Sequence, residues 1–582
     1  MKKFIALLLC LILALPFSAC KKTPDGPALN DSTQTPAGSP SPQPSIPSET
    51  SSPQASVPPQ DNGSYAFRNA DFEEAFRKKY QLSGDIKPET LADFTVLELD
   101  NAGLTDISDI AAFKNLKEIS LSGNKISGLE PLSQLSFPAK LDISSNPVWD
   151  IAPLAQLTGL IDLNLSGCSV SVLSPLEKLG KLEKLDLSFN YELSDIKPLG
   201  NITSLKELNL CGAYLINNIS PLAKLTGLTG LNLGELGAND ISALKNLKSL
   251  QKLYIGNMDT DACTVCAVSD WSPLAYLSEL NELYINTNSA FAAAAEQIAR
   301  LTNLEILSIS FYDEAENILS LAGLPALREL HIIRSGLNDL SLLAPFTNIE
   351  KLDLSINEIT DLSPLAKLTK LTKLNIAQNN VSDITPLSHL KNLTVLDMHN
   401  NEIEDISPVS GLKKLEELNF NFNRVVDISP LAGLNKLTSL SLSGNRPDDL
   451  TPLCGLEALV FLNIAQTGSD NTEALACLSS LKTLVLFGNR INDISPLCAL
   501  TGLETLRLQD NLIDDLTPLK ALCALKELNI RNNRLNSTSD LSPLYGLKTL
   551  KNIYIAKQNE GFEFSKAELE ILQSELPYAF IK

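Results

Sequence analysis

The amino-acid sequence predicts an α/β solenoid, an arc of stacked coils with a parallel β-sheet on its concave face. Three observations predict this fold class: one motif returns at a fixed step, its leucines alternate as in a half-buried strand, and a proline-bearing segment follows each strand. We expect short 3-10 or irregular segments on the convex side and a helical cap at each end.

The repeat is regular over much of the chain. Between residues 335 and 533 a 22-residue pattern recurs nine times, and Leu352–Ile359 is followed by Leu374–Val381 and then by Leu396–Ile403. The same step links positions 102, 124, 146, 168 and 190, and looser spacings of 22 to 30 residues bridge the middle. We therefore expect about 21 units over residues 91–558.

Each unit begins with a short strand. In the L-x-L pattern two apolar side chains point to one face and the residue between them points to the other face, which is the period-two signature of a half-buried strand. Each strand is reached by a full turn of chain, so neighbouring strands are parallel. The residues between the leucines therefore line a shared concave surface.

An asparagine follows most of the strands. Its side-chain amide can pair with backbone groups that the parallel sheet leaves unpaired at the turn, and Cys168 stands at one such position. We expect a structural row of asparagines, made up of Asn124, Asn146, Asn190, Asn357, Asn379, Asn401, Asn423, Asn445, Asn489, Asn511 and Asn533.

The return path carries the pattern D-I-S-P-L, as in Asp405–Pro408 and Asp427–Leu431. Serine or threonine is a favoured N-cap residue, and proline fits the first helical position because its missing N–H is not needed there. We expect a short helical segment on the convex side of each coil, with the serine or threonine as its cap.

Both ends of the repeat array have helix signals. Phe72, Ala75, Phe76 and Tyr80 have the spacing of one helix face, which predicts an N-terminal cap over residues 66–90. At the other end Ser565 and Glu568 form a capping-box pattern that opens a helix through about residue 576, with Leu569 and Leu572 facing inward. This predicts a C-terminal cap over residues 559–582.

The first 65 residues differ in composition from the repeats. Lys2 and Lys3 precede an apolar run over residues 4–15, which has the layout of a secretory signal over residues 1–19. Phe17–Cys20 resembles the lipobox of bacterial lipoproteins, with Phe17 in place of the usual leucine; the resemblance implies lipidation of Cys20. Residues 20–65 are rich in Pro, Ser and Thr, which predicts a disordered stalk.

The 22-residue unit L-x-x-L-x-L-x-x-N-x-I-x-D-I-x-P-L-x-x-L-x-x resembles the internalin-type leucine-rich repeats of bacterial surface proteins. The resemblance covers roughly residues 91–558. It implies a concave sheet face that binds host or other proteins. The sequence lacks an immunoglobulin-like module after the repeats and a wall-sorting motif, so invasion of host cells is not implied.

Composition and motifs argue against several function classes. The 47 Lys and Arg residues face 68 Asp and Glu, and the net charge of -21 opposes nucleic-acid binding. The three histidines, His331, His389 and His399, have no metal-ligand spacing, and no hydrolase, P-loop or zinc-protease motif is present. Asp and Asn recur at the exposed strand position, which indicates a solvated face. We expect no enzyme activity, cofactor or metal.

Eight cysteines lie beyond the signal segment and Cys20. Cys263 and Cys266 form a single CxxC, which leaves a local disulfide and a free pair as the alternatives. A second group occupies the convex side of neighbouring coils, where adjacent turns bring pairs near bonding distance, although we favour buried thiols as small apolar fillers. That group is Cys454, Cys477, Cys498 and Cys523.

Aromatic side chains occupy the concave position on consecutive coils. Neighbouring exposed aromatics are typical of a binding hot spot, and the alternative is that these rings pack against the insertions of the irregular middle coils. The first predicted patch comprises Tyr254, Tyr284, Phe311, His331 and Arg334, with Asn286 beside it, and the second comprises Phe422, Phe461 and Phe487.

Together these features predict an exported protein on the extracellular face of the membrane, lipid-anchored through Cys20, that binds an extracellular protein through its concave face. The alternative is a cell-wall or glycan-binding scaffold, because aromatics flanked by Asp, Asn and Gln also stack on sugars. We expect a monomer.

Overall fold

The computed structural model describes residues 64–135, 138–256, 268–286, 291–310, 315–536, 540–555, 557–558 and 562–582. The chain divides into Met1–Asn62 and Gly63–Lys582, and the first unit lies outside the described residues. The predicted signal segment, Cys20 and nearly all of the predicted stalk therefore lie outside them as well, as do Cys263, Cys266 and Phe311.

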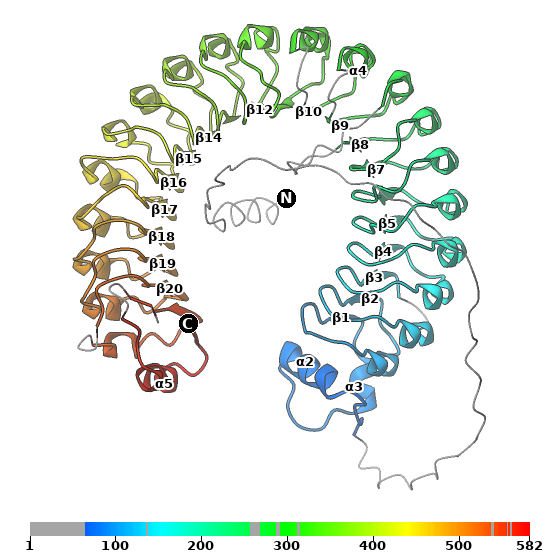
Figure 1. Ribbon diagram of the computed structural model, residues 1–582, viewed down its shortest axis with the longest axis horizontal. Coiled ribbons are helices and arrows are strands. Elements are labelled where there is room, and N and C mark those ends of the chain that lie inside the picture. Colours follow the sequence, from blue (N-terminus) through cyan, green and yellow to red (C-terminus); the bar gives the residue numbers. More distant parts are fainter. Residues whose placement is uncertain are drawn as a thin grey trace, which may run out of the picture. The chain divides into compact units, whose positions relative to one another are not determined.

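Gly63–Lys582 is an open solenoid whose strands form a single parallel sheet of 22 strands on the inner side of the coils (Figure 1). Each strand pairs with the next one along the chain, and Leu352, Leu374 and Leu396 lie opposite one another in register. The predicted fold class is therefore confirmed. We number each coil after its strand, so that coil 16 begins at β16.

The strands are three to five residues long, except for the two-residue strand at the C-terminal end. They are β1 Val96–Glu98, β2 Glu118–Ser120, β3 Lys140–Asp142, β4 Asp162–Asn164, β5 Lys184–Asp186, β6 Glu207–Asn209, β7 Gly230–Leu233, β8 Lys252–Ile255, β9 Glu282–Asn286, β10 Ile306–Ser310, β11 Glu329–Ile332, β12 Lys351–Asp353, β13 Lys373–Asn375, β14 Val395–Asp397, β15 Glu417–Asn419, β16 Ser439–Ser441, β17 Phe461–Asn463, β18 Thr483–Val485, β19 Thr505–Arg507, β20 Glu527–Asn529, β21 Asn552–Tyr554 and β22 Phe580–Ile581.

Short 3-10 helices return the chain on the outer side of the coils (Figure 1). They are η1 Ser108–Ala112, η2 Glu130–Gln134, η3 Ala152–Gln156, η4 Ser174–Lys178, η5 Lys197–Asn201, η6 Ser220–Lys224, η7 Ser242–Asn246, η8 Ser272–Tyr276, η9 Ala315–Gly323, η10 Leu340–Leu343, η11 Ser363–Lys367, η12 Thr385–His389, η13 Ser407–Gly411, η14 Ser429–Leu431, η15 Thr451–Gly455, η16 Glu473–Cys477, η17 Ser495–Ala499, η18 Thr517–Ala521 and η19 Ser542–Leu544.

The expected capping by serine or threonine is wrong. In coil 14, Ser407 N donates to Asp405 Oδ1 at 2.7 Å, so the aspartate two residues earlier accepts the free N–H. Ser407 begins the helix, and Pro408 takes its second position. Because a 3-10 helix of five residues leaves its first N–H groups unpaired, an acceptor just outside the helix serves them better than one within it.

The asparagine row joins neighbouring coils by hydrogen bonds beneath the turn. Asn379 Nδ2 donates to Leu354 O of the preceding coil at 2.9 Å and to Ile376 O at 3.1 Å. Its Oδ1 accepts from Ile359 N at 3.0 Å. All eleven asparagines of the row are buried. They pair backbone groups that would otherwise be buried without partners, in a core built from the leucine rows.

The N-terminal cap is held by aromatic packing and by one buried carboxylate. It contains helices α2 (Ala70–Tyr80) and α3 (Pro88–Ala92). Phe72 and Phe76 are buried, and their rings contact Phe113 of the first coil. Asp109 is fully buried and accepts from the Tyr65 hydroxyl at 2.8 Å and from the Asn69 N–H at 2.8 Å.

The C-terminal cap contains helix α5 (Lys566–Glu575), which opens on the capping box of Ser565 and Glu568. Leu572 is buried, and Leu569 is partly buried against the core. The sequence did not predict β22, which pairs with β21, or helix α4 (Phe291–Ile298), which replaces the 3-10 helix of coil 9. No helix in the described part of the chain has the length and apolar character needed to cross a bilayer.

Candidate functional site

Aspartate and asparagine form a polar row along the middle of the concave face. Asn375 Nδ2 donates to Asp353 Oδ2 of the preceding strand at 3.0 Å, and Asp353 Oδ1 accepts from Ser355 N at 2.9 Å. The same pairing joins Asn164 to Asp142. These carboxylates are already occupied by hydrogen bonds within the sheet, so the row acts as a structural ladder.

Two tyrosines interrupt this row at its centre. Tyr254 on β8 and Tyr284 on β9 lie opposite each other in the register of the sheet. Their rings are stacked, with centroids 4.2 Å apart and planes inclined by 5°. Both side chains are half-buried. The pair therefore presents an aromatic surface whose geometry is fixed by the strands beneath it.

A glycine allows the end of β8 to approach β9 closely. Gly256 has φ +104°, and a Cβ at this position would lie 2.8 Å from the backbone N of Asn286. A residue with a side chain would push the two strand ends apart. Beside the rings, Lys252 pairs with Glu282 across the same two strands at 2.8 Å.

His331 on β11 continues the central row two strands beyond Tyr284. Only Ser308 of β10 separates the two positions in the register, and Ser308 is 3% exposed. His331 Nε2 lies 2.9 Å from Glu329 Oε1, and its Nδ1 lies 4.0 Å from Asp353 Oδ2. We call Tyr254, Tyr284, Glu329, His331 and Asp353 the tyrosine–histidine site.

The carboxylates keep the imidazole protonated. Burial lowers the pKa of His331, but the two nearby carboxylates of Asp353 and Glu329 outweigh burial and raise that pKa to about 9. The hydrogen bond from His331 in turn lowers the pKa of Glu329 to about 2, against the opposing effect of burial, and Lys351 donates to the same carboxylate at 2.6 Å. At neutral pH His331 is therefore a cation with fixed counter-charges, which is a poor arrangement for a general base.

The tyrosines are likewise held in their neutral form. Burial, followed by the nearby Glu282 carboxylate, raises the pKa of Tyr254. Burial and the neighbouring Tyr254 raise the pKa of Tyr284. Both hydroxyl groups are therefore neutral at neutral pH and can both donate and accept hydrogen bonds.

The structure brings only part of the first predicted patch together. Tyr254, Tyr284 and His331 share the central row, whereas Phe311 lies outside the described residues. Arg334 is exposed and lies at the turn after β11, with φ +51°. It borders the concave face and is not part of the central row.

The second predicted patch is not a cluster of touching rings. Phe461 on β17 and Phe487 just after β18 are half-buried on the concave side. Phe422 is exposed at the left-handed turn that follows β15. Among the described residues no ring-to-ring contact joins these three side chains.

Sequence reasoning missed two groups of side chains. Near the C-terminal end Arg507 pairs with Glu527 at 3.1 Å, and Arg531 lies 5.2 Å from the ring centroid of Tyr554. On the flank of the coils, the rings of Tyr191 and Tyr214 lie 5.8 Å apart and are exposed, with Phe189 beside them. The signal for the second group was available, because each tyrosine directly follows the position of the asparagine row.

The convex cysteines do not behave as the buried thiols that we favoured from the sequence. Cys454 and Cys477 form a disulfide between adjacent coils, with Cα atoms 5.4 Å apart. Cys498 and Cys523 are exposed thiols. All four convex cysteine side chains face solvent, so none of these positions requires a small apolar filler. Among the described residues no cluster of His, Cys, Asp or Glu has the makings of a metal site.

Comparisons with known proteins identify the repeat. A family model described as leucine-rich repeats in two copies matches residues 347–389, 369–413, 413–455 and 479–521, and a single leucine-rich-repeat model matches residues 115–135. A comparison with curated proteins gives no match.

Several solved structures are similar to this chain. An internalin from Listeria monocytogenes is 28% identical over 69% of this chain and 96% of its own, with a TM-score of 0.35. A second internalin from the same organism is 31% identical over 34% of this chain and 84% of its own, with a TM-score of 0.30. A leucine-rich-repeat protein from Leptospira interrogans is 21% identical over 85% of this chain and 97% of its own, with a TM-score of 0.39.

Proposed function

Since the chain is a leucine-rich-repeat protein, we propose that it is a binding module whose concave face takes a protein partner at the tyrosine–histidine site. The observation that carries the proposal is the stacked pair of Tyr254 and Tyr284 in the middle of the polar row. Aromatic side chains on a rigid surface contribute strongly to protein interfaces because they bury a large area with little loss of conformational freedom.

The replacement of the polar row by tyrosines favours binding over a structural role. Where this position is aspartate or asparagine, its side chain accepts a backbone N–H two residues on, as Asn232 does from Gly234 at 2.9 Å. A tyrosine gives up that bond. The stacked rings leave part of their surface open to solvent, and a partner that covers this surface adds to their stabilisation.

Binding can be tested with the full chain immobilised and exposed to mixtures of extracellular proteins. We expect Tyr254→Ala combined with Tyr284→Ala to reduce capture at least tenfold, since interface anchors contribute about 2 kcal/mol or more. Tyr276→Ala is the matched control, because Tyr276 is an exposed tyrosine on the convex helix η8. Equal capture by the double variant and the control would refute the proposed site.

We further propose that the protein is exported and anchored by a lipid on Cys20. The proposal rests on the basic and apolar residues at the start of the chain and on the lipobox-like Phe17–Cys20. The Cys454–Cys477 disulfide supports export, because disulfides persist mainly in oxidising compartments. In a bacterium that matures lipoproteins, labelled palmitate should enter the chain and Cys20→Ala should abolish labelling, whereas Cys10→Ala should not. Labelling that survives Cys20→Ala would exclude this anchor.

The repeat residues support an internalin-type array, in which the unit is 22 residues long and carries the D-I-x-P-L return path. A glycan-binding scaffold is the second candidate. It is favoured by the exposed rings of Trp149, Tyr191 and Tyr214 on the flank of the coils. Purified glycans in the same capture assay distinguish the two, since capture of glycans alone, lost in Tyr191→Ala with Tyr214→Ala, would support the scaffold and exclude the protein-binding site.

A further inference from the structure

One junction between coils differs from its neighbours on the flank of the solenoid. From coil 12 to coil 20, the residue after the asparagine row donates its N–H to the preceding coil, as Arg446 N does to Val425 O at 3.1 Å and Arg490 N does to Ser469 O at 2.9 Å. Between coils 16 and 17 the equivalent bond, from Gly468 N to Pro447 O, is not made.

The asparagine row is also broken at this junction. In the standard arrangement Val425 N donates to Asn445 Oδ1 at 3.0 Å. At the junction of coils 16 and 17 the donor position is Pro447, which has no N–H, and the acceptor position is Thr467, which has no amide. The bond that Asn445 Nδ2 makes to Phe420 O of the coil before it has no counterpart from Thr467. Three kinds of cross-coil bond are therefore missing from one seam.

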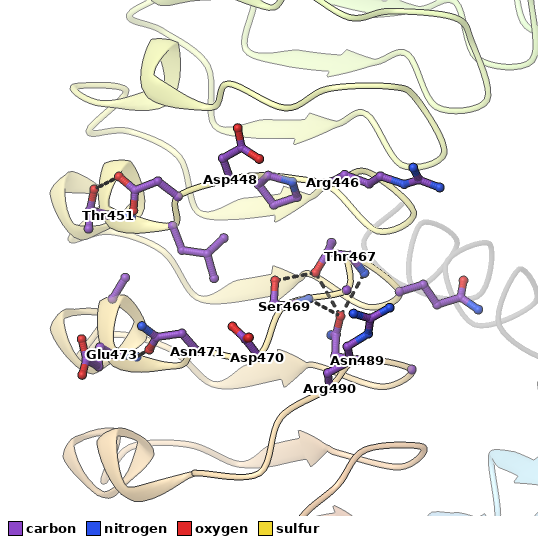
Figure 2. Close-up of a pocket in the computed structure, with 17 residues that line it drawn as sticks. Arg446, Asp448, Thr451, Thr467, Ser469, Asp470, Asn471, Glu473, Asn489 and Arg490 are labelled. Carbon is purple, nitrogen blue, oxygen red and sulfur yellow. Dashed lines mark hydrogen bonds between the residues drawn. The ribbon is translucent and has the colours of Figure 1, made fainter.

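A cleft opens at this seam. Its volume is about 990 Å³, and it is lined by polar residues of coils 16, 17 and 18, including Arg446, Asp448, Asp470 and Arg490 (Figure 2). Thr467 on coil 17 donates hydrogen bonds to Asn489 on coil 18, so the next junction along the chain is bonded. The positions that carry buried aliphatic residues in other coils are taken here by Pro447 and Ser469, so less side-chain volume fills the flank.

The two coils are nevertheless joined on either side of the cleft. On the concave side β16 and β17 remain paired, and Gly444 N donates to Ala465 O at 3.0 Å beyond the strands. On the convex side the Cys454–Cys477 disulfide joins η15 to η16. The disulfide thus bridges the same two coils that lack the flank bonds, whereas the thiols Cys498 and Cys523 lie on coils 18 and 19, whose flank bonds are intact.

We propose that the Cys454–Cys477 disulfide is a redox latch on this seam, and that a dithiol reductant opens coils 16 and 17 about the β16–β17 pairing. Both cysteines are exposed, so a reductant can reach them. A thiolate of the dithiol attacks one sulfur and forms a mixed disulfide, and the other cysteine leaves as a thiolate. The second thiol of the reductant then releases the first cysteine, so that the protein gains two electrons and two protons and the dithiol becomes a disulfide.

Opening is expected because, within the described part of the chain, this disulfide is the only side-chain cross-link that holds the convex sides of coils 16 and 17 together. In a solenoid each coil contacts mainly its neighbours, so the loss of one junction stays local. The cleft then widens on the convex side while the sheet stays paired.

The latch can be tested by peptide-resolved hydrogen exchange on the full chain, with dithiothreitol as the reductant. Reduction should speed amide exchange in residues 445–478 at least tenfold and change residues 489–522 less than twofold. Cys454→Ser with Cys477→Ser should reproduce the effect without reductant. Cys498→Ser with Cys523→Ser is the matched control and should leave exchange in both segments unchanged.

A rescue variant separates the latch from general destabilisation. Pro447→Val with Thr467→Asn restores the residue types found at coils 15 and 16, and in the Cys454→Ser, Cys477→Ser background it should slow exchange of residues 445–478 back to within threefold of the oxidised protein. The proposal is overturned if reduction of the wild-type chain leaves amide exchange in residues 445–478 unchanged, or if exchange speeds up equally in both segments. It is also overturned if the restored residues of the asparagine row do not slow exchange.

Discussion

Replacement of one buried asparagine tests whether the asparagine row holds the coils together. Asn379 is 7% exposed and contacts the backbone of two coils. Its Nδ2 donates to Leu354 O at 2.9 Å and Ile376 O at 3.1 Å, and its Oδ1 accepts from Ile359 N at 3.0 Å. Asn379→Ala removes these three bonds, together with the longer one from Nδ2 to Ala377 O at 3.2 Å, and adds no new steric contact.

The magnitude follows from what each backbone group retains. Ile359 N loses its acceptor in the neighbouring coil, and an unpaired buried N–H costs about 1 to 3 kcal/mol. The two carbonyl oxygens each keep another amide donor, Asn357 Nδ2 at 2.9 Å for one and Asn401 Nδ2 at 2.9 Å for the other. Their weakening adds about 0.5 kcal/mol each, so the free energy of local opening should fall by about 2 to 4 kcal/mol.

Hydrogen exchange measures this opening at single coils. A fall of about 2 to 4 kcal/mol speeds exchange of the Ile359 amide by roughly 30- to 700-fold, at 1.4 kcal/mol per factor of ten. Asn380→Ala is the control, because Asn380 is the exposed neighbour. An unchanged rate at Ile359, or the same acceleration in Asn380→Ala, would refute the structural role that we assign to the row.

Three further predictions concern the site and the caps. The pKa of His331 is raised to about 9, so its ion pairs stabilise the folded chain fully below pH 6.5 and lose that effect as the pH rises through 9. Glu329→Gln should lower the pKa of His331. An NMR titration that finds the imidazole pKa near 6.5 in the wild-type chain would contradict this prediction. Asp109→Ala should make residues 64–69 accessible to proteolysis and lower the free energy of unfolding of the N-terminal cap by about 3 kcal/mol. Unchanged cleavage would exclude Asp109 as the residue that holds this segment. Ser565→Ala should destabilise α5 by about 1 kcal/mol, measured by amide exchange in residues 566–575, and no change there would argue against the capping box.

The regular part of the fold was predictable because its signals are local. The alternation at Leu374 and Ile376 gives the strand, and the repeat length sets the register of one strand against the next. Counting from Leu253 and Leu283 also places Tyr254 opposite Tyr284, although 30 residues separate them. Register in a sheet with one buried face is fixed by its apolar rows, so this inference survives irregular coil lengths.

The features that the sequence did not predict depend on contacts between coils, which the pattern of a single coil does not contain. β22 forms because the edge of β21 is available for pairing, and Phe580–Ile581 has no repeat signal of its own. The Cys454–Cys477 bond depends on a Cα separation of 5.4 Å on the convex side, which the strand spacing does not fix. By contrast, the pairing of Glu329 with His331 could have been predicted, since Glu329 lies two residues before His331 and so shares its face of the strand.

The polar residues of the repeat explain why function should be sought at interruptions. The side-chain amide of Asn379 is hydrogen-bonded to backbone groups, and the carboxylate of Asp353 accepts from Ser355 and Asn375. Few hydrogen-bonding positions on either side chain are therefore left for a ligand. An interruption removes such bonds and must be stabilised in another way. Ring stacking and ion pairs replace them around Tyr284, and a disulfide replaces them at the seam of coils 16 and 17. We propose that the stacked rings bind a partner surface and that the disulfide reacts with a reductant. The hydrogen-bonded rows of the regular coils do neither.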